Sequence, residues 1–142
     1  MKYEILDCTN EDDAFIDDML CEFNLAQCPP DGDPKRVIGW FGKKITDGNG
    51  KIIGGCTAVR SVWGTAEVDF LWVDEAYRRQ GLGSQLLREV EGVVKESGCT
   101  IIHLDTFDWQ AKGFYEKHGY SVFGTLEDCP TGHCRYYMKK SI

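Results

Sequence analysis

The stretch VDFLWVDEAYRRQGLGSQLLREVEG, Val68 to Gly92, decides how the rest of the chain is interpreted. Its first residues, up to Val73, are largely apolar and predict a strand, and a short turn with two arginines and two glycines follows. From Gln80 to Ser97 the apolar residues recur at helical spacing, and Gly98 is a typical helix stop. The sequence therefore predicts a strand, a tight turn and an amphipathic helix in immediate succession.

This junction has the chemistry of a local anion site. The first amides of a helix have no intrahelical acceptor, and the helix dipole favours negative charge there. Gly81 and Gly83 let a ligand approach the backbone, while Arg78 and Arg79 supply cationic donors suited to phosphate. The segment is neither a P-loop nor a G-x-G-x-x-G fingerprint, because Leu86 stands where the third glycine would be. The alternative interpretation is a helix start eased by glycine, with solvated arginines.

Length and charge limit the classes of protein that fit. A chain of 142 residues is long enough for one domain with a real core, and we expect a single domain over residues 1–142. The 23 acidic and 16 basic residues give a net charge of −7, which disfavours binding along a nucleic acid. No apolar run approaches the roughly 20 residues that span a bilayer, and the N-terminus turns acidic where a signal peptide is apolar. We expect a soluble, cytoplasmic protein that does not bind membranes.

The cysteines favour reduced thiols. Seven are scattered along the chain without a C-x-x-C pair, which fits neither a disulfide framework nor a zinc knuckle. The densest group, CPTGHC, offers Cys129, His133 and Cys134 but no fourth ligand. We therefore predict no metal site.

Periodicity and turn signals predict the remaining elements. Strands are predicted over residues 2–8, 36–45, 51–63, 65–73, 99–107, 120–126 and 134–140, and helices over residues 9–27, 80–97 and 109–119. The sequence TDGNG between the second and third strands is a strong hairpin signal. This order predicts an α/β domain of the α+β type, with a central, mostly antiparallel mixed sheet flanked by helices.

Two motifs together resemble one family. LWV followed by YRRQGLGSQLL, and then LDTF with QAKGFYEKHGY, closely resemble the GNAT superfamily of acyl-CoA-dependent N-acyltransferases. The motifs span Glu67 to Tyr120, and the element order extends the resemblance to nearly the whole chain. The resemblance implies a single GNAT-like domain whose sheet splays open at the cofactor site. It also implies acetyl-CoA as cosubstrate and no metal.

The resemblance also assigns the cofactor contacts. It places the pyrophosphate of acetyl-CoA on backbone amides of the arginine-glycine turn and the pantetheine arm beside the end of the preceding strand, where two amides can pair as a neighbouring strand would. The residues so implied are Leu71, Trp72, Val73, Arg78, Arg79, Gln80, Gly81, Leu82, Gly83 and Ser84.

Acyl transfer to an amine requires a proton acceptor and a proton donor. A primary amine has a pKa of about 10.4 and must lose a proton before it attacks. Glu67 and Asp69 precede Leu71 and Val73 by even steps, which predicts that all four share one face of a regular strand. The resemblance implies Glu67 as the general base, directly or through water, with Asp69 as the substitute. The alternative is a solvated sheet face, and a bulge in the strand would break the argument.

Tyr115 in AKGFYEKHGY matches the tyrosine whose hydroxyl, in this family, protonates the departing thiolate. Phe114 is expected to face the core and Tyr115 to point elsewhere, although Tyr115 could also be a packing residue. Asp108 stands where the family often has asparagine, and a carboxylate cannot donate a hydrogen bond as an amide does. The contact at that position is therefore open.

The acceptor is only loosely constrained. Acidic residues of the first predicted helix could steer a cationic amine or form a solvated face, aromatic residues could line an acceptor pocket or fill the core, and Arg135 could bind a substrate carboxylate or stay at the surface. The residues concerned are Glu11, Asp12, Asp13, Asp17, Asp18, Glu22, Trp40, Phe41, Trp63, Trp72 and Trp109. The leading hypothesis is an N-acetyltransferase acting on a primary amine of a small molecule or peptide by direct attack. The alternative is a non-catalytic acyl-CoA sensor or regulatory domain, and whether the chain forms a homodimer is open.

Overall fold

The computed structural model describes residues 2–30 and 39–142, which belong to two compact units, Met1–Asp33 and Pro34–Ile142. The first unit contains helix α1, Asn10–Gln27, as predicted. Thr9 caps it in a capping box: its Oγ1 accepts from the amide of Asp12 at 3.2 Å, and its own amide donates to Asp12 Oδ2 at 2.8 Å. No helix in the described residues is long and apolar enough to cross a membrane.

The strand predicted over residues 2–8 is absent. Residues 2–8 have no regular structure, and Tyr3, Ile5 and Leu6 are exposed. A strand exists only where its backbone groups pair with a neighbour. The alternation of apolar and polar residues that suggested the strand does not by itself supply that neighbour.

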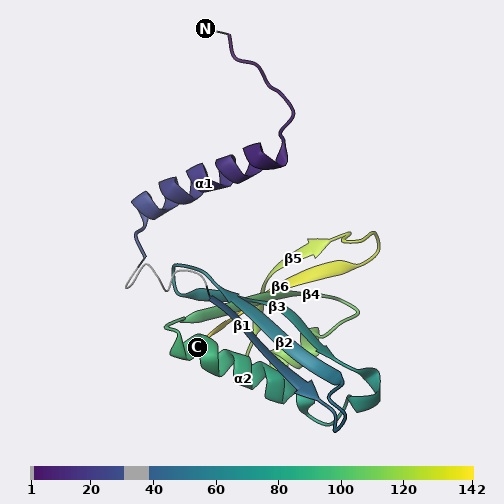
Figure 1. The fold of residues 1–142 in the computed structure, drawn as a ribbon. Coiled ribbons are helices and arrows are strands. Elements are labelled where there is room, and N and C mark those ends of the chain that lie inside the picture. The colour runs from purple at the N-terminus through teal and green to yellow at the C-terminus, as the bar shows by residue number, and fades with distance from the viewer. Residues whose placement is uncertain (1, 31–38) are drawn as a thin grey trace. The chain divides into compact units, whose positions relative to one another are not determined.

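The second unit is built on a six-stranded sheet with the order β1-β2-β3-β4-β6-β5 (Figure 1). Its elements are β1 Gly39–Thr46, β2 Ile52–Arg60, β3 Thr65–Val73, the short 3-10 turn η2 Glu75–Tyr77, α2 Leu82–Glu96, β4 Ile101–Phe107, α3 Lys112–Lys117, β5 Ser121–Glu127 and β6 Cys134–Ser141. Every described pairing is antiparallel except that of β3 with β4. The predicted mixed, mostly antiparallel sheet is confirmed.

The first hairpin follows its turn signal. Asp47 Oδ1 accepts from the amides of Asn49 at 2.8 Å and Lys51 at 2.9 Å, and Gly50 has a φ of 84°. These contacts join β1 to β2. The first three residues of the predicted strand, 36–38, lie outside the described residues.

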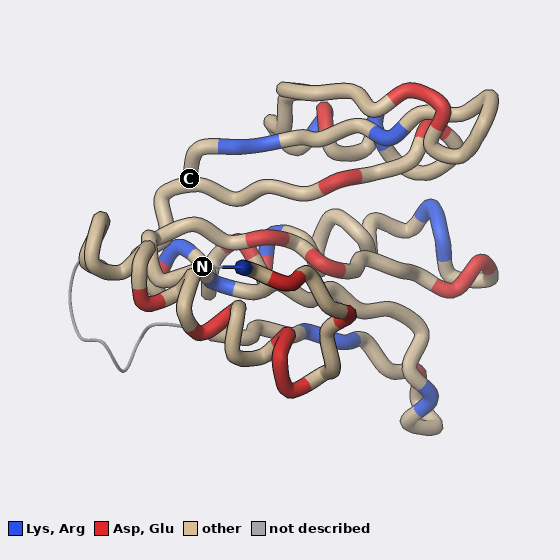
Figure 2. Tube along the Cα trace, turned by 90° about the horizontal axis from the view of Figure 1, so that it is seen from above, with Lys and Arg blue, Asp and Glu red and all other residues tan. Residues whose placement is uncertain are grey.

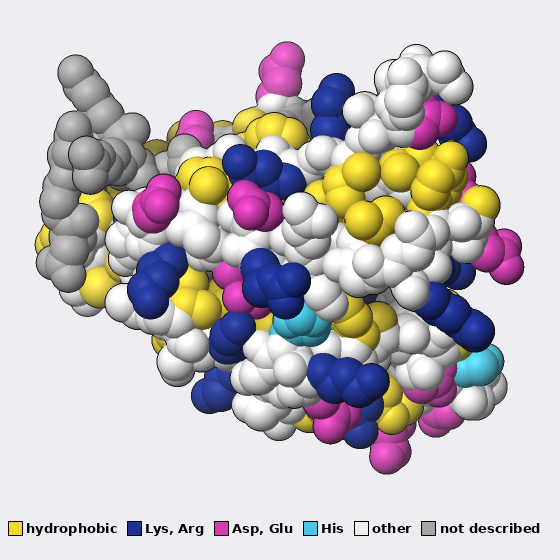
Figure 3. Space-filling view, turned by 90° about the horizontal axis from the view of Figure 1, so that it is seen from below, with side chains coloured by type: hydrophobic (Ala, Val, Ile, Leu, Met, Phe, Trp, Pro, Cys, Tyr) yellow, Lys and Arg dark blue, Asp and Glu magenta, His cyan; other side chains and the backbone are white. Residues whose placement is uncertain are grey.

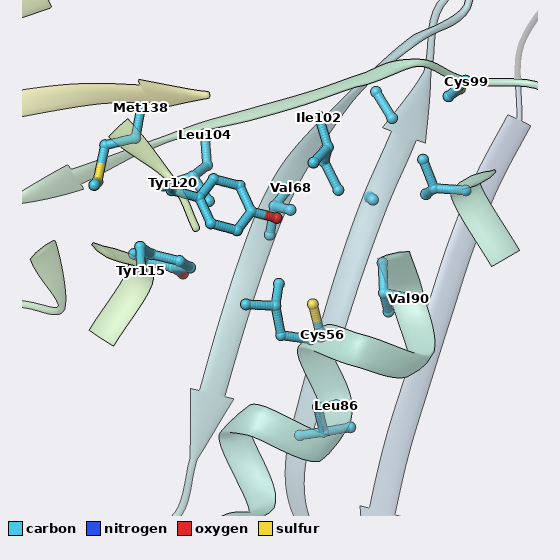
Figure 4. Packing of buried hydrophobic residues seen from close by; sticks show 14 residues of the cluster. Cys56, Val68, Leu86, Val90, Cys99, Ile102, Leu104, Tyr115, Tyr120 and Met138 are labelled. Carbon is cyan, nitrogen blue, oxygen red and sulfur yellow. The ribbon is translucent and has the colours of Figure 1, made fainter. Parts of the chain in front are cut away.

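The core lies between α2 and the sheet. Helix α2 buries one stripe, Leu86, Leu87, Val90 and Val94, against β1, β2 and β3. The facing strand residues include Cys56, Ala58, Ala66, Val68, Ile102 and Leu104, and Figure 4 shows most of this cluster. Cys56 and Cys99 are buried in it and fill the core. The exposed Cys8, Cys21 and Cys28 do not.

Strands β3 and β4 diverge. They pair only at their starts, where Thr65, Ala66 and Glu67 face Ile101, Ile102 and His103. Beyond that point the edge of β3 toward β4 has no strand partner among the residues that the structure describes, while β2 still pairs with β3 and β6 with β4. A register shift between Thr57 and Ala58 leaves Asp69 as an extra residue in β3, and a bulge of this kind increases local twist. The predicted splay of the sheet is therefore present.

Candidate functional site

The turn after β3 is held by its own side chains. Asp74 Oδ1 accepts from the amide of Ala76 at 3.0 Å, and Arg78 Nε donates to the carbonyl of Val73 at 2.9 Å. The Ala76 amide, together with Lys51 at 3.3 Å, lowers the pKa of Asp74. Arg78 thus holds the end of β3 in addition to bearing a charge, a role that the sequence did not reveal.

The start of α2, where the sequence predicts an anion site, has an unusual backbone geometry. Arg79 and Gly81 are both left-handed, with φ of 62° and 78°, and no side chain caps the helix. The first intrahelical bond runs from Gln85 to the carbonyl of Gly81 at 3.0 Å, so the amides of residues 82–84 precede it. A non-glycine residue held at positive φ is uncommon and often marks a functional turn.

A histidine that the sequence did not single out lies beside this helix start. Ser84 Oγ and His118 Nε2 are 2.9 Å apart, and the ring of Phe114 is 4.7 Å from that of His118. Burial lowers the pKa of His118, which favours a neutral imidazole near pH 7. No sequence motif marks His118 as a neighbour of Ser84, because the two residues come together only in the folded chain.

The predicted shared face of β3 is wrong. Glu67 and Asp69 are exposed, whereas Leu71 and Val73 pack against the core with Ala66 and Val68. The extra residue at Asp69 shifts the alternation by one position, so side chains after it exchange faces. Glu67 therefore shares its face with the exposed Phe70 and Trp72.

Tyr115 is buried, with 6% of its surface exposed, and belongs to the core cluster (Figure 4). Phe114 is the less buried of the two, which reverses the predicted arrangement. The Tyr115 ring meets those of Phe114 and Tyr120 edge-on, at 5.2 and 5.6 Å. Burial, and then the charges of Cys56 and Asp105, raise the pKa of Tyr115 to about 12, so its hydroxyl keeps its proton at neutral pH. Among the described residues that hydroxyl has no hydrogen-bond partner.

The Asp108 carboxylate makes its contacts with groups of the protein itself. Its carboxylate accepts from the amide of Cys134 at 3.2 Å and lies 2.9 Å from His133 Nδ1. Burial acts to raise the pKa of Asp108, but the hydrogen bonds from His133 and Cys134 outweigh it and hold the pKa below its usual range. The carboxylate thus joins the end of β4 to the start of β6. In the part of the chain that is described, no group of three or more His, Cys, Asp or Glu could hold a metal ion.

Asp105 was not singled out by the sequence, and it pairs with Arg135. Arg135 Nη2 and Nε lie 2.7 and 2.9 Å from Asp105 Oδ1. The signal was present in the alternation of β4, where Asp105 and Phe107 face away from the buried Leu104 and Thr106. Asp105 could therefore have been chosen as a candidate site residue from its position in the predicted strand.

The tryptophans are mostly outside the core. Trp40, Trp63, Trp72 and Trp109 are exposed, while Phe41 packs against the core. Trp109 stacks on Phe107 with ring centroids 4.5 Å apart. The prediction of core packing is thus wrong for the tryptophans.

A buried polar group joins α2 to the other half of the sheet. Glu91 accepts from the Tyr120 hydroxyl at 2.8 Å and from Lys140 Nζ at 2.9 Å. The Glu91 side chain is only 12% exposed. Each of its oxygens therefore has a donor where water has little access.

Basic and acidic side chains are mixed in the part of the chain that the structure describes. Lys and Arg positions are scattered along the trace in Figure 2, and in the face that Figure 3 shows they are mixed with Asp and Glu. The acidic side chains of α1 are exposed. This distribution suits a local anion site and not a long phosphate backbone.

Comparison with known proteins gives the family. Residues 3–120 match the acetyltransferase (GNAT) family, and the chain therefore belongs to it. Blasticidin-S acetyltransferase of Streptomyces morookaense is 37% identical over 81 residues, which are 56% of this chain and 60% of that protein. The crystal structure of an acetyltransferase from Bacillus cereus ATCC 14579 is 35% identical, with a TM-score of 0.87 over 99% of this chain and 98% of that chain.

The same fold occurs in a more distant relative. The structure of aminoglycoside 6'-N-acetyltransferase complexed with coenzyme A is 20% identical and has a TM-score of 0.64 over 72% of each chain. At that identity the likeness concerns the fold alone.

Proposed function

We propose that this protein transfers the acetyl group of acetyl-CoA to a primary amine of a small molecule or peptide. The observation that carries the proposal is the opening between β3 and β4. At that opening an unpaired strand edge leads into the left-handed turn before α2, and a protonated phenol is packed close by in the core. Family membership supports the same reaction.

The residues present fit acetyl-CoA. The unpaired edge of β3 at Leu71, Trp72 and Val73 could pair with the amides of pantetheine as an added strand. The pyrophosphate would rest on the amides from Arg79 to Ser84, where Gly81 and Gly83 leave the backbone accessible. At Gly83 an added Cβ would come 3.6 Å from the Phe114 ring, so the loop is already closely packed on its inner side.

The two proton-transfer groups lie on different faces of the sheet. Acetyl-CoA supplies an activated acyl group as a thioester, and the amine nitrogen forms its bond to the carbonyl carbon as the carbon–sulfur bond breaks. Glu67, on the exposed face, takes the proton that the amine loses, directly or through water. Tyr115, on the core face, gives its proton to the departing thiolate and recovers one from solvent. The bulge at Asp69 supports this division, because it turns the last residues of β3 over relative to Glu67.

The acceptor class follows from the relatives. Blasticidin-S acetyltransferase is named for a small molecule, and we extend that class of acceptor to this chain as part of the proposal. The described cysteines form no disulfide, which supports a cytoplasmic location, where thiols stay reduced.

The test is release of free thiol that requires both acetyl-CoA and an amine from a panel. Replacing Glu67→Gln should remove the base and shift the activity toward high pH, where the amine is already neutral. A protein that binds acetyl-CoA but releases no thiol with any amine would be a sensor and not an enzyme. If Glu67→Gln turned over at the wild-type rate at every pH, Glu67 would be excluded as the base.

A further inference from the structure

A carboxylate on β4, Asp105, lies at the opening between β3 and β4 and has no role in the proposed reaction. On β4, Asp105 and Phe107 lie beyond the last residue that pairs with β3, which is His103. Their side chains face away from the buried Leu104 and Thr106, and so away from α2. Asp105 therefore lies on the diverging part of the sheet, on the same face as Glu67, whose Cα partner is His103.

The pairing of Asp105 with Arg135 leaves one oxygen free. Both Nη2 and Nε of Arg135 approach the same atom, Oδ1, at 2.7 and 2.9 Å. A fully bidentate pair would use both carboxylate oxygens. Oδ2 has no hydrogen-bond partner among the described residues, although the Asp105 side chain is only 23% exposed. Oδ2 is not among the buried polar atoms that lack a partner, so water or a ligand can reach it and donate a hydrogen bond to it.

Aromatic rings hold the arginine in place. The Arg135 guanidinium lies 5.4 Å from the ring centroid of Phe107 and 5.6 Å from that of Tyr137. Trp109 stacks on Phe107 from the next turn of the chain. The guanidinium is therefore fixed between rings, and it fixes the carboxylate in turn.

The charge of Asp105 reaches the candidate catalytic tyrosine. It is one of the two charges that raise the pKa of Tyr115, after burial. The negative charge of Asp105 therefore acts on Tyr115 electrostatically. Asp108, which also forms a hydrogen-bonded pair, uses both oxygens on His133 and Cys134.

We propose that Asp105 Oδ2, positioned by Arg135, binds a cationic group of the acceptor that is distinct from the amine being acetylated. The reacting amine must give its proton to Glu67, and a lasting ion pair with a second carboxylate, Asp105, would hold that amine in its protonated form. A second ammonium or guanidinium group has no such conflict and would gain a charge-assisted hydrogen bond. The acceptor class is therefore a small molecule with at least two cationic groups. This inference rests on the proposed acetyl transfer.

The first experiment measures binding without turnover. Spermidine, 1,3-diaminopropane, blasticidin S and propylamine are titrated by calorimetry into the protein saturated with coenzyme A. A hydrogen bond to a charged group contributes about 1.5–3 kcal/mol, so Asp105→Asn should weaken the best multiply charged ligand roughly 10- to 100-fold and leave propylamine nearly unchanged. Glu127→Gln, an exposed carboxylate on β5 of the same hairpin, is the matched control and should bind as the wild type does.

The second experiment tests the positioning role of Arg135. In the thiol-release assay Arg135→Gln should raise KM for a diamine more than KM for propylamine, and Arg135→Lys should restore part of the difference. Thermal unfolding of each variant shows whether it is folded.

Two results would overturn the inference. One is that no multiply charged amine binds more tightly than propylamine; the other is that Asp105→Asn weakens both kinds of ligand equally. If acetyl-CoA did not raise the Tm of the wild type, the proposed function itself would be overturned. The two failures are therefore distinguishable.

Discussion

The two sides of the opening are built by different means. On the proposed cofactor side, β3 and α2 offer main-chain groups, with the left-handed Arg79 and Gly81 and the uncapped helix start. On the acceptor side, β4 and β6 offer side chains that meet across 30 residues of sequence, as Asp105 and Arg135 do. A binding site made of backbone leaves a compact motif in the sequence, whereas one made of distant side chains leaves none.

The largest expected effect concerns Tyr115, the proposed proton donor, which belongs to the core cluster. Tyr115→Phe keeps the ring in the core but removes the proton that the thiolate requires. General acid catalysis contributes typically 10²- to 10⁴-fold, so kcat should fall by about that factor with little change in acetyl-CoA affinity. Steady-state thiol release and calorimetry measure the two quantities.

A kcat within about twofold of the wild type would show that Tyr115 is only a packing residue. Tyr3→Phe is the matched control, because Tyr3 is exposed and does not belong to the core cluster.

The next effect concerns the link between the two sides. Tyr120→Phe removes one of the two donors to Glu91 and leaves a largely buried carboxylate oxygen unsatisfied. The expected loss in the free energy of unfolding is about 1–3 kcal/mol, measured by urea denaturation. An unchanged midpoint would mean that water replaces the hydroxyl, and that Lys140 alone joins α2 to β6.

A matched pair of alanine substitutions tests the backbone character of the cofactor side. Gly81 has a φ of 78°, so Gly81→Ala should destabilise by about 1–2 kcal/mol and weaken acetyl-CoA binding. Gly92 lies inside α2 with open space around it, so Gly92→Ala should stabilise by about 0.5–1 kcal/mol and leave binding unchanged. If both substitutions changed the stability in the same direction, the left-handed backbone at Gly81 would not explain the difference between the two positions.

The smallest effect is a pH dependence from His118. Its pKa is lowered from 6.5 in the folded protein by burial, so the unfolded chain binds more protons below about that pH. Stability from this group is present above pH 6.5 and is lost as pH falls toward the folded pKa. His118→Gln should flatten the stability profile in that window, and an identical profile in the variant would remove His118 as its source.

The sequence predicted the fold well where local signals agree with packing. The apolar stripe of α2, the turn at Asp47 and the motif at Gly81 all describe local geometry, and all are present. The prediction over residues 2–8 was wrong because alternation does not supply a partner strand.

The candidate site was predicted only in part. The shared face of Glu67 and Leu71 was wrong because a bulge depends on how β3 pairs with β2, and no residue type marks it. Asp105 was missed because its contact with Arg135 forms only when β6 pairs with β4. The residues of the proposed cofactor turn are consecutive and form a local pattern, whereas those of the proposed acceptor side are far apart in the sequence.

The most direct test of the account is thermal unfolding with and without acetyl-CoA. At a hundred times its dissociation constant, a ligand should stabilise the folded state by about 2.7 kcal/mol. We predict a clear upward shift of Tm for the wild type and for Asp105→Asn, and a smaller one for Gly81→Ala. An unchanged Tm of the wild type at millimolar acetyl-CoA would contradict the central claim that the opening between β3 and β4 binds this cosubstrate.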